Sequence, residues 1–237
     1  MEMGSKNALA VMDDADIDLA VAMSAGGAFG GTGQKCTASS RLIVHANVHD
    51  EFVEKLLKAT QAMKVGHGQE AGTQIGPVVS QQQLDENLAY VDLGISEGAE
   101  LVCGGQRLEM PTTGFYMSPG VFINTTNDMR INREEMFAPL AAVIKVGSYD
   151  EALATLNDTN FGLTAGIMTN SLARATHFRR NAKAGCVMVN LATAGTDYHV
   201  PFGGRGDSSY GPREQGSYAA EFYTVVKTAY ISSGTPN

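Results

Sequence analysis

The stretch "LTAGIMTNSLARATHFRRNAKAGCVMVN" (residues 163–190) places two short apolar runs on either side of a helical segment. "LTAGIMT" and "GCVMVN" have the length and composition of buried strands, and "SLARATHFRRN" between them has the composition of a helix. Strand, helix and strand in this order form the unit from which parallel sheets are built. The stretch therefore predicts an α/β fold.

The same alternation continues on the amino-terminal side. Further strands are expected at the apolar runs 7–12, 40–45 and 140–146. Helices are expected over 17–29, from Asp50, from a Ser80 cap to Gly98, and over "DEALATLNDT". The Gly/Pro-rich residues 104–120 predict turns and short strands. Together these segments predict an α/β domain with a largely parallel, twisted sheet flanked by helices.

The last segment, "EFYTVVKTAYISS" (221–233), alternates polar and apolar residues beyond the last expected helix. Such alternation predicts a strand. A terminal strand without a neighbour in its own chain is a pairing edge for another subunit. We therefore expect a C-terminal oligomerisation strand and a homo-oligomer.

Composition excludes several classes of protein. The chain of 237 residues is 43% hydrophobic, which is typical of a globular protein, and its formal charge of −8 disfavours nucleic acid and anionic membranes as partners. No apolar run approaches the roughly 20 residues of a membrane helix, and the amino terminus lacks the pattern of a signal peptide. Three cysteines without a CxxC pair and five histidines without metal-ligand spacing predict neither disulfides nor a metal site. A reducing, cytoplasmic location is expected.

A second stretch, "GGTGQKCTASSR" (30–41), carries the candidate chemistry. Its glycines suggest a phosphate-binding loop, but a P-loop needs GxxxxGK[ST], and here Gln34 separates Gly33 from Lys35. The dinucleotide pattern GxGxxG fails as well, because Cys36 occupies its last position. Phosphate binding by this loop is therefore disfavoured.

Cys36 itself allows two interpretations. A free cysteine is most often a small core residue. The polar residues around Cys36 are not a core context, and the neighbouring Lys35 and backbone N–H groups would favour the thiolate. From these residues alone, a nucleophile and a core residue stay equally open. Cys103 and Cys186 lie in apolar strand contexts and are predicted to be core residues.

"GGTGQKCTASSRLIV" resembles the nucleophile segment of the aldehyde dehydrogenase superfamily, whose pattern is FxxxGQxCxxxxR. Further matches follow in the order of the family. "MEMGSK" (1–6) resembles the general-base segment ELGGK, "REEMFAPL" (133–140) resembles EEIFGPV, and "VPFGGRGDSSYGPREQG" (200–216) resembles PFGGxKxSGxGREGG. The separation of 34 residues between Glu2 and Cys36 is also the one that the family uses.

The resemblance implies a function for six residues. Cys36 would be the nucleophile and Glu2 the general base, while Glu135 and Phe137 would contact the nicotinamide ribose and ring of NAD or NADP. Thr37 and Phe202 would contact a small-molecule aldehyde. On the sequence alone, without Cys36 as a partner, Glu2 is better explained as a disordered terminal carboxylate, and Phe137 is by default a core residue. A solvated charge for Glu135 and ordinary loop packing for Phe202 explain these residues at least as well as a function does. "NLATAGTDYHVPFGG" (190–204) with "GPREQG" most resembles the branch that oxidises 2-oxoglutarate semialdehyde.

The sequence departs from the family patterns at three places. Ser5 replaces the second glycine of ELGGK, Ala138 replaces the glycine of EEIFGP, and "RGDSSYGP" lacks the usual Lys-x-Ser-Gly. The first two changes exchange one small residue for another, so we expect the backbone to approach its neighbours as closely as in the family.

Family members are about twice this length, and their amino-terminal half is a Rossmann-like domain that binds the cofactor. The resemblance thus implies that this domain is absent, that residues 1–6 are a remnant of its end, that 7–215 form the catalytic domain, and that 216–237 form the oligomerisation tail. Two alternatives to an active enzyme stay open. One is an inactive fragment that keeps the fold, and the other is an interaction module that needs a partner chain carrying the complementary amino-terminal half.

Overall fold

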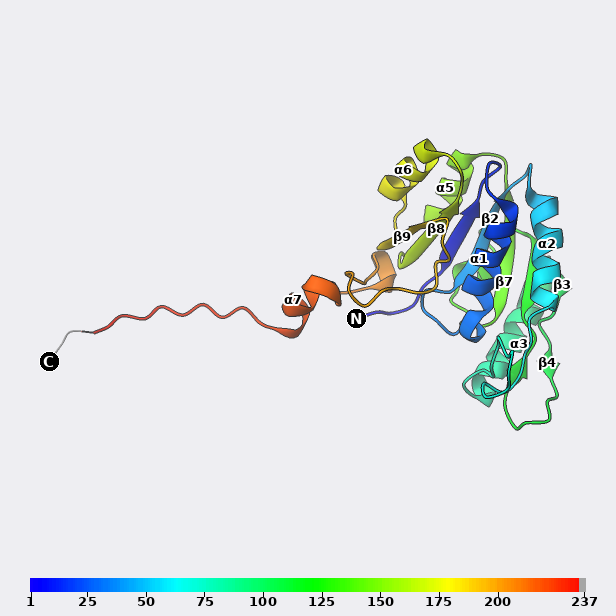
Figure 1. Ribbon diagram of the computed structural model, residues 1–237, viewed down its shortest axis with the longest axis horizontal. Helices are drawn as coiled ribbons and strands as arrows, with labels where there is room; N and C mark the ends of the chain where they lie inside the picture. Colours follow the sequence, from blue (N-terminus) through cyan, green and yellow to red (C-terminus); the bar gives the residue numbers. More distant parts are fainter. Residues whose placement is uncertain (235–237) are drawn as a thin grey trace.

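In the computed structural model, which describes residues 1–234, seven strands form one sheet in the order β3-β6-β7-β2-β1-β8-β9 (Figure 1). All neighbouring strands are parallel except β3 and β6, which are antiparallel. The strands of this sheet are β1 (Asn7–Val11), β2 (Ser39–His45), β3 (Glu100–Cys103), β6 (Gly120–Thr125), β7 (Leu140–Val146), β8 (Thr164–Met168) and β9 (Cys186–Val189). β4 (Arg107–Leu108) and β5 (Tyr116–Met117) form a separate hairpin. The predicted α/β fold with a largely parallel sheet is confirmed.

The helices begin where the sequence supplies a side-chain cap. Asp16 Oδ1 accepts the N–H of Leu19 at 3.0 Å, and Ser80 Oγ accepts the N–H of Gln83 at 3.1 Å. The helices are α1 (Ile17–Phe29), α2 (His49–Gln61), α3 (Gln81–Ser96), α4 (Arg130–Arg133), α5 (Tyr149–Asn157), α6 (Leu172–Asn181) and α7 (Ala219–Tyr223). Short 3-10 turns are η1 (Gly30–Gly33), η2 (Gly206–Ser208) and η3 (Gly216–Tyr218). Within residues 1–234, no helix combines the length and the apolar character that a membrane crossing requires.

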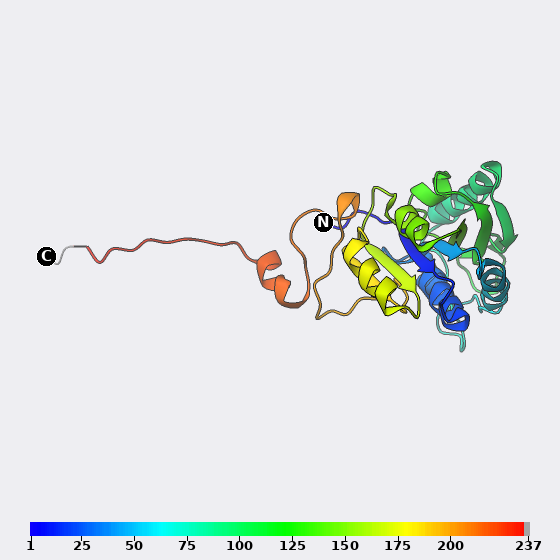
Figure 2. The same ribbon diagram turned by 90° about the horizontal axis from the view of Figure 1, so that it is seen from above.

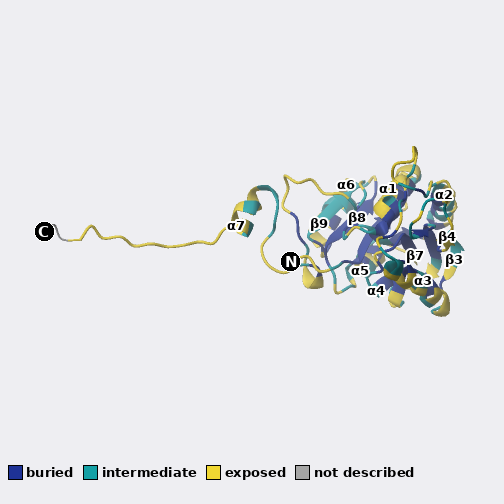
Figure 3. Ribbon diagram, turned by 90° about the horizontal axis from the view of Figure 1, so that it is seen from below, coloured by how far each residue is buried: buried dark blue, intermediate teal, exposed yellow. Residues whose placement is uncertain are grey.

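Helices cover both faces of the sheet, which is why its central strands read as continuous apolar runs. Leu9 and Val11 of β1 belong to the core beneath α1 and α2, whereas Ala8 and Ala10 belong to the core beneath α5 and α6. A third core cluster lies between α3 and the strands β6 and β7. In Figure 3 the strands are the buried layer, and the exposed residues lie on the helices, loops and tail.

Two segments differ from the sequence-based expectation. β6 was not expected, because its apolar run follows directly on the turn-rich residues 104–120. The predicted C-terminal strand is wrong for this single chain: residues 221–223 belong to α7, and residues 224–234 form no strand. This tail leads away from the body of the protein in both views (Figures 1 and 2), and its large apolar side chains are more than nine-tenths exposed. A strand needs a partner for its backbone, and the body of this chain offers the tail none.

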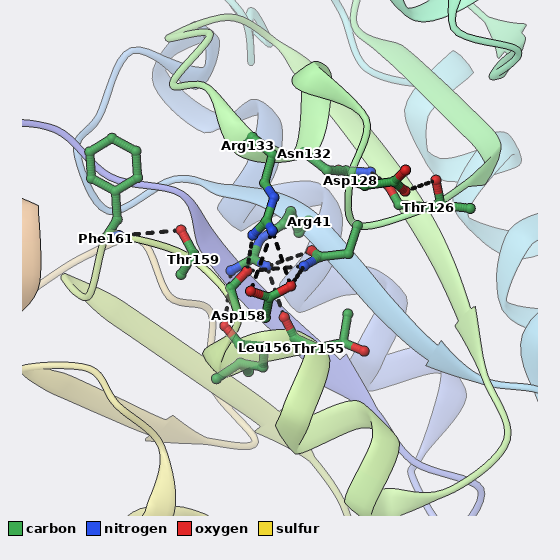
Figure 4. A network of polar contacts seen from close by, with 11 residues as sticks. Arg41, Thr126, Asp128, Asn132, Arg133, Thr155, Leu156, Asp158, Thr159 and Phe161 are labelled. Carbon is green, nitrogen blue, oxygen red and sulfur yellow. Dashed lines mark hydrogen bonds and ion pairs between the residues drawn. The ribbon is translucent and has the colours of Figure 1, made fainter.

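Arg41, the arginine of the predicted nucleophile segment, lies almost wholly buried near the start of β2. Its Nε and Nη2 donate to the carbonyl of Lys6 at 3.2 and 2.9 Å, and Nη2 also donates to the carbonyl of Leu156 at 3.0 Å. Nη1 donates to Asn127 Oδ1 at 2.9 Å and to the carbonyl of Thr155 at 3.0 Å. Figure 4 shows Arg41 against the last turn of α5, where helix carbonyls favour a positive charge. Arg41 therefore connects the segment before β1, the start of β2 and the end of α5.

We expect Arg41→Lys to lower the free energy of unfolding by about 3 kcal/mol, because an ammonium cannot reach carbonyls on both sides as a guanidinium does. Urea unfolding followed by circular dichroism measures the loss. Arg107→Lys is the matched control, since Arg107 is half-exposed and its ion pair with Glu109 spans 3.5 Å. The free energy of unfolding of this control should stay within about 0.5 kcal/mol of that of the parent. Equal effects of the two substitutions would contradict the assignment.

Candidate active site

The predicted site segments lie on loops that lead into neighbouring parallel strands. Residues 1–6 precede β1, residues 30–38 precede β2, and residues 134–139 precede β7. Because β1, β2 and β7 are parallel, the three loops meet at the amino-terminal edge of the sheet. Ligands of open α/β sheets more often bind beyond the carboxyl ends of the strands. Here the residues that could do chemistry gather at the opposite edge.

The loop before β2 packs tightly against the loop before β7. Gly31, Thr32 and Gly33 all have positive φ angles, of 65°, 62° and 65°. At Gly33 a Cβ atom would lie 2.0 Å from the carbonyl oxygen of Ala138, so only glycine permits this approach. The contact brings the loop of Cys36 against the loop that carries Glu135.

The carbonyl of Cys36 is held from the side of β1. Ser5 Oγ donates to Cys36 O, and Asn7 Nδ2 donates to the same oxygen at 2.7 Å and to Ala38 O at 2.8 Å. Asn7 Oδ1 in turn accepts the N–H of Thr164 at 3.0 Å, which connects this contact to β8. The polypeptide on the carboxyl side of Cys36 is thus fixed by Ser5 and by Asn7, the first residue of β1.

A second set of hydrogen bonds holds the residues after Cys36. Thr193 Oγ1 donates to the carbonyl of Thr37 at 2.8 Å and lies 2.5 Å from Ser39 Oγ. Thr37, Ser39 and Thr193 are all buried. The hydroxylated residues around Cys36, which suggested a solvent-exposed loop in the sequence, therefore lie inside the protein with their hydroxyls or carbonyls paired.

Two carboxylates act on the Cys36 thiol. Burial raises the pKa of this half-buried thiol above its ordinary value, and the negative charges of Glu2 and Glu135 raise it further. The backbone N–H groups of Cys36 and Thr37 act in the opposite direction. The sequence predicts that Lys35 and nearby backbone N–H groups favour the thiolate. The N–H groups of Cys36 and Thr37 do lower the thiol pKa, but burial and two carboxylates raise it by more. Lys35 is exposed, so solvent screens its charge.

Glu135 and Phe137 lie beside this loop in conformations that the local backbone fixes. Glu135 Oε1 accepts the N–H of Ser5 at 2.9 Å, and the Ser5 hydroxyl, whose proton goes to Cys36 O, lies 3.4 Å from the same oxygen. Burial raises the pKa of the Glu135 carboxyl, while the Ser5 N–H lowers it. Phe137 has a φ of 54° and stays 37% exposed. A bulky residue at positive φ whose ring is not packed in the core is typical of a functional position rather than a structural one.

Thr37 and Phe202 do not line one common pocket. Phe202 is buried and lines an open groove of about 520 Å³ between β9 and the loop that follows it. The other residues of this groove include Met23, Cys186, Met188, Leu191, Val200 and Pro201. Thr37 reaches the groove only indirectly, because its carbonyl binds Thr193, and residues on both sides of Thr193 line the groove.

Comparisons with known proteins identify the family of the chain. A profile of the aldehyde dehydrogenase family matches residues 1–229. The chain belongs to the aldehyde dehydrogenase family. It is 43% identical to an alpha-ketoglutaric semialdehyde dehydrogenase of Bacillus subtilis and 44% identical to an alpha-ketoglutarate semialdehyde dehydrogenase of Haloferax volcanii, in each case over 98% of this chain and 48% of the relative. The chain therefore spans about half the length of the curated relatives it matches.

The fold of the chain also matches solved structures. An NAD-dependent aldehyde dehydrogenase from Sinorhizobium meliloti superposes with a TM-score of 0.92 at 34% identity, over 100% of this chain and 46% of that one. Family membership and the enzyme class predicted from the sequence are thereby confirmed. Which residues of this aldehyde dehydrogenase chain act in catalysis stays a prediction.

Sequence reasoning missed the polar residues that hold the site of this aldehyde dehydrogenase together. Asn7, Ser39 and Thr193 belong to no part of the family patterns that identified Cys36, and each reads as an ordinary strand or loop residue. Asn7 and Thr193 bind the backbone carbonyls of Cys36, Ala38 and Thr37, and Ser39 binds the hydroxyl of Thr193, 154 residues away in the chain. The one available signal was Asn7, a polar residue at the start of an otherwise apolar strand.

We expect Gly33→Ala to destabilise this aldehyde dehydrogenase chain by at least about 3 kcal/mol, because its Cβ would collide with the Ala138 carbonyl and the backbone has positive φ. Gly30→Ala is the matched control, since no atom lies within 4 Å of its added Cβ. The control should change the free energy of unfolding by no more than about 0.5 kcal/mol. Chemical denaturation of both variants distinguishes the two cases, and equal stabilities would refute the close approach.

Lys6 makes stability depend on pH. Burial and the charge of Arg41 lower the pKa of its amine from 10.5 to about 7. Between these two values the unfolded chain binds a proton that the folded chain does not, so raising the pH favours folding. Relative to Lys6→Met, the wild-type chain should gain up to about 1.4 kcal/mol of stability per pH unit between pH 7 and 8.5. Urea unfolding across this range measures the gain, and a constant difference between the two proteins would disprove it.

Proposed function

We propose that this chain carries the catalytic residues of an NAD(P)-dependent aldehyde dehydrogenase that oxidises 2-oxoglutarate semialdehyde to 2-oxoglutarate. The observation that carries the proposal is the convergence of Cys36, Glu2 and Glu135 at one edge of the sheet, where both carboxylates act on the thiol. A thiol that is half-buried between two acids is costly to ionise and has no evident structural purpose.

Cys36 supplies the nucleophile. After losing its proton, the sulfur adds to the aldehyde carbon and forms a thiohemiacetal whose oxygen carries the negative charge. The backbone N–H groups of Cys36 and Thr37, which already favour negative charge on the sulfur, are in place to donate to that oxygen. Departure of the former aldehyde hydrogen as hydride then leaves a thioester on Cys36.

Glu2 supplies the base for the second half of the reaction. Its carboxylate is exposed to water, and its charge is among those that raise the pKa of the Cys36 thiol. Glu2 takes a proton from this water as its oxygen attacks the thioester carbon. The carboxylate product leaves, and the Cys36 thiolate is restored.

The residues present fit the nicotinamide end of the cofactor. NAD(P)+ accepts the hydride when it is bound. The hydrogen bond from the Ser5 N–H falls on Oε1 of Glu135, which leaves Oε2 to accept from the ribose hydroxyls. The half-exposed Phe137 ring is available for the planar nicotinamide. The sites for the rest of the cofactor would lie in the half of the relatives that this chain does not match.

The assignment of the aldehyde rests on the relatives. "NLATAGTDYHVPFGG" and the similarity to two alpha-ketoglutarate semialdehyde dehydrogenases favour 2-oxoglutarate semialdehyde over a simple aldehyde. Thr37 and Phe202 remain the candidate residues for the pocket, with Phe202 on the wall of the groove beside β9. The cytoplasmic location also stays a prediction.

A second proposal concerns assembly. The tail 224–234 carries exposed Val225, Val226, Tyr230 and Ile231, and β9 is an outer strand of the sheet. Pairing of the tail with β9 of another copy would satisfy both backbones and cover these apolar side chains. We therefore propose that the chain forms a homo-oligomer. A separate chain that carries the complementary amino-terminal half would bind to this assembly as a further partner.

Activity tests the enzyme proposal. We expect the chain to hydrolyse p-nitrophenyl acetate, a reaction that needs the Cys36 thiolate but no hydride acceptor, and Cys36→Ser to lose it about 100-fold or more. Cys103→Ser is the matched control and should keep the rate. Reduction of NAD(P)+ with 2-oxoglutarate semialdehyde is expected once an amino-terminal half is added. Absence of both activities would favour the inactive fragment.

Light scattering tests the assembly proposal. At micromolar concentration the whole chain should form a dimer or a larger oligomer, because its exposed tail and the β9 edge complement each other. A variant that ends at residue 223 should be monomeric with an unchanged circular dichroism spectrum. A monomeric whole chain, or an oligomer that survives the truncation, would argue against pairing through the tail.

A further inference from the structure

The hydroxyl of Ser209 binds the carboxylate that faces Cys36. Ser209 Oγ donates to Glu2 Oε2 at 2.5 Å, and the N–H of Gly204 donates to Ser209 Oγ at 2.6 Å. Glu2 and Ser209 also form an isolated antiparallel bridge. The glutamate is therefore held both through its backbone and through its side chain.

The geometry leaves the Ser209 proton a single direction. A serine hydroxyl has one proton to donate and two lone pairs, and the Gly204 N–H occupies one of the lone pairs. The proton then points to the Glu2 carboxylate, and a hydrogen bond to an ionised acceptor is among the strong ones. Ser209 stands where the pattern PFGGxKxSGxG has glycine, so this hydroxyl is not part of the family pattern.

The backbone does not require this serine. Ser209 has φ −148° and ψ 144°, an extended conformation that alanine and threonine adopt without strain. Its hydroxyl therefore needs another explanation, and the explanation available is its contact with Glu2.

We propose that Ser209 is a positioning residue that holds the Glu2 carboxylate beside Cys36. Without the hydroxyl, the exposed glutamate side chain would gain rotamer freedom and spend more time in solvent, away from the sulfur. The contacts with Ser209 hold the Glu2 charge in place, and only the name of base for Glu2 rests on the proposed function.

The charged groups around the thiol make this placement measurable. Glu2 faces Cys36 from the segment before β1, and Glu135 faces it from the loop before β7, both raising the thiol pKa beyond the effect of burial. Lys6 acts on Glu135 from within the protein. Movement of Glu2 alone should therefore lower the thiol pKa, and the rate of alkylation follows the thiolate fraction.

The experiment measures the rate at which iodoacetamide alkylates Cys36 as a function of pH, in a background of Cys103→Ser and Cys186→Ser. Glu2→Gln should speed alkylation at pH 7 by about three- to tenfold, because it removes one nearby negative charge. Ser209→Ala should act in the same direction, and Ser209→Thr, which keeps the hydroxyl, should behave as the parent. In the Glu2→Gln background, Ser209→Ala should have no further effect.

Asp207→Asn is the matched control, because it removes an exposed charge from the same loop that is not among the groups acting on Cys36. Its profile should equal that of the parent. An unchanged profile for Ser209→Ala, or the same change with and without Glu2→Gln, would overturn the proposal and leave Ser209 a structural residue. Thermal unfolding checks that each variant is folded. No aldehyde or cofactor takes part, so the outcome is independent of whether the chain oxidises aldehydes.

Discussion

The buried guanidinium of Arg41 is the constraint on which the site depends. A cation with less than a tenth of its surface exposed is stable only if its donors are paired, and Arg41 pairs them with carbonyls of Lys6, Thr155 and Leu156 and the amide of Asn127. Lys6 lies four residues after Glu2, and Arg41 lies five residues after Cys36. The same side chain thus fixes the register between the segment of the predicted base and the segment of the predicted nucleophile.

The rest of the site follows from parallel pairing and close approach. Parallel strands bring the loops before β1, β2 and β7 to one edge, and Gly33 lets two of these loops touch at the Ala138 carbonyl. Ser5, Asn7 and Thr193 then hold the carbonyls of Cys36 and Thr37. Because almost every partner is a backbone atom, the arrangement tolerates many side-chain changes elsewhere.

The charged and polar groups around Cys36 act on the pKa of its thiol in opposite directions. Burial and two carboxylates raise the pKa of the Cys36 thiol, while the backbone N–H groups of Cys36 and Thr37 act in the opposite direction. Negative charge on a reacting oxygen would meet the same N–H groups. Hydroxyls at Ser5 and Ser209, two positions where the family patterns have glycine, each contact one of the two carboxylates. The two carboxylates whose charges raise the thiol pKa are therefore each contacted by a hydroxyl that the family patterns do not include.

The sequence by itself determined the order of strands and helices, the parallel sheet and the family, because apolar periodicity, helix caps and the segment around Cys36 are local signals. It also singled out Cys36, Glu2 and Glu135 before their proximity was known. The strand predicted for the C-terminal tail does not form within the single chain, and no signal in the sequence indicated that burial and two carboxylates raise the pKa of Cys36. Only the tertiary structure decided the charges around the thiol and the contacts of Asn7, Thr193 and Ser209. Burial and hydrogen bonds join residues up to 207 positions apart in the chain, and such long-range contacts leave no trace in the local sequence.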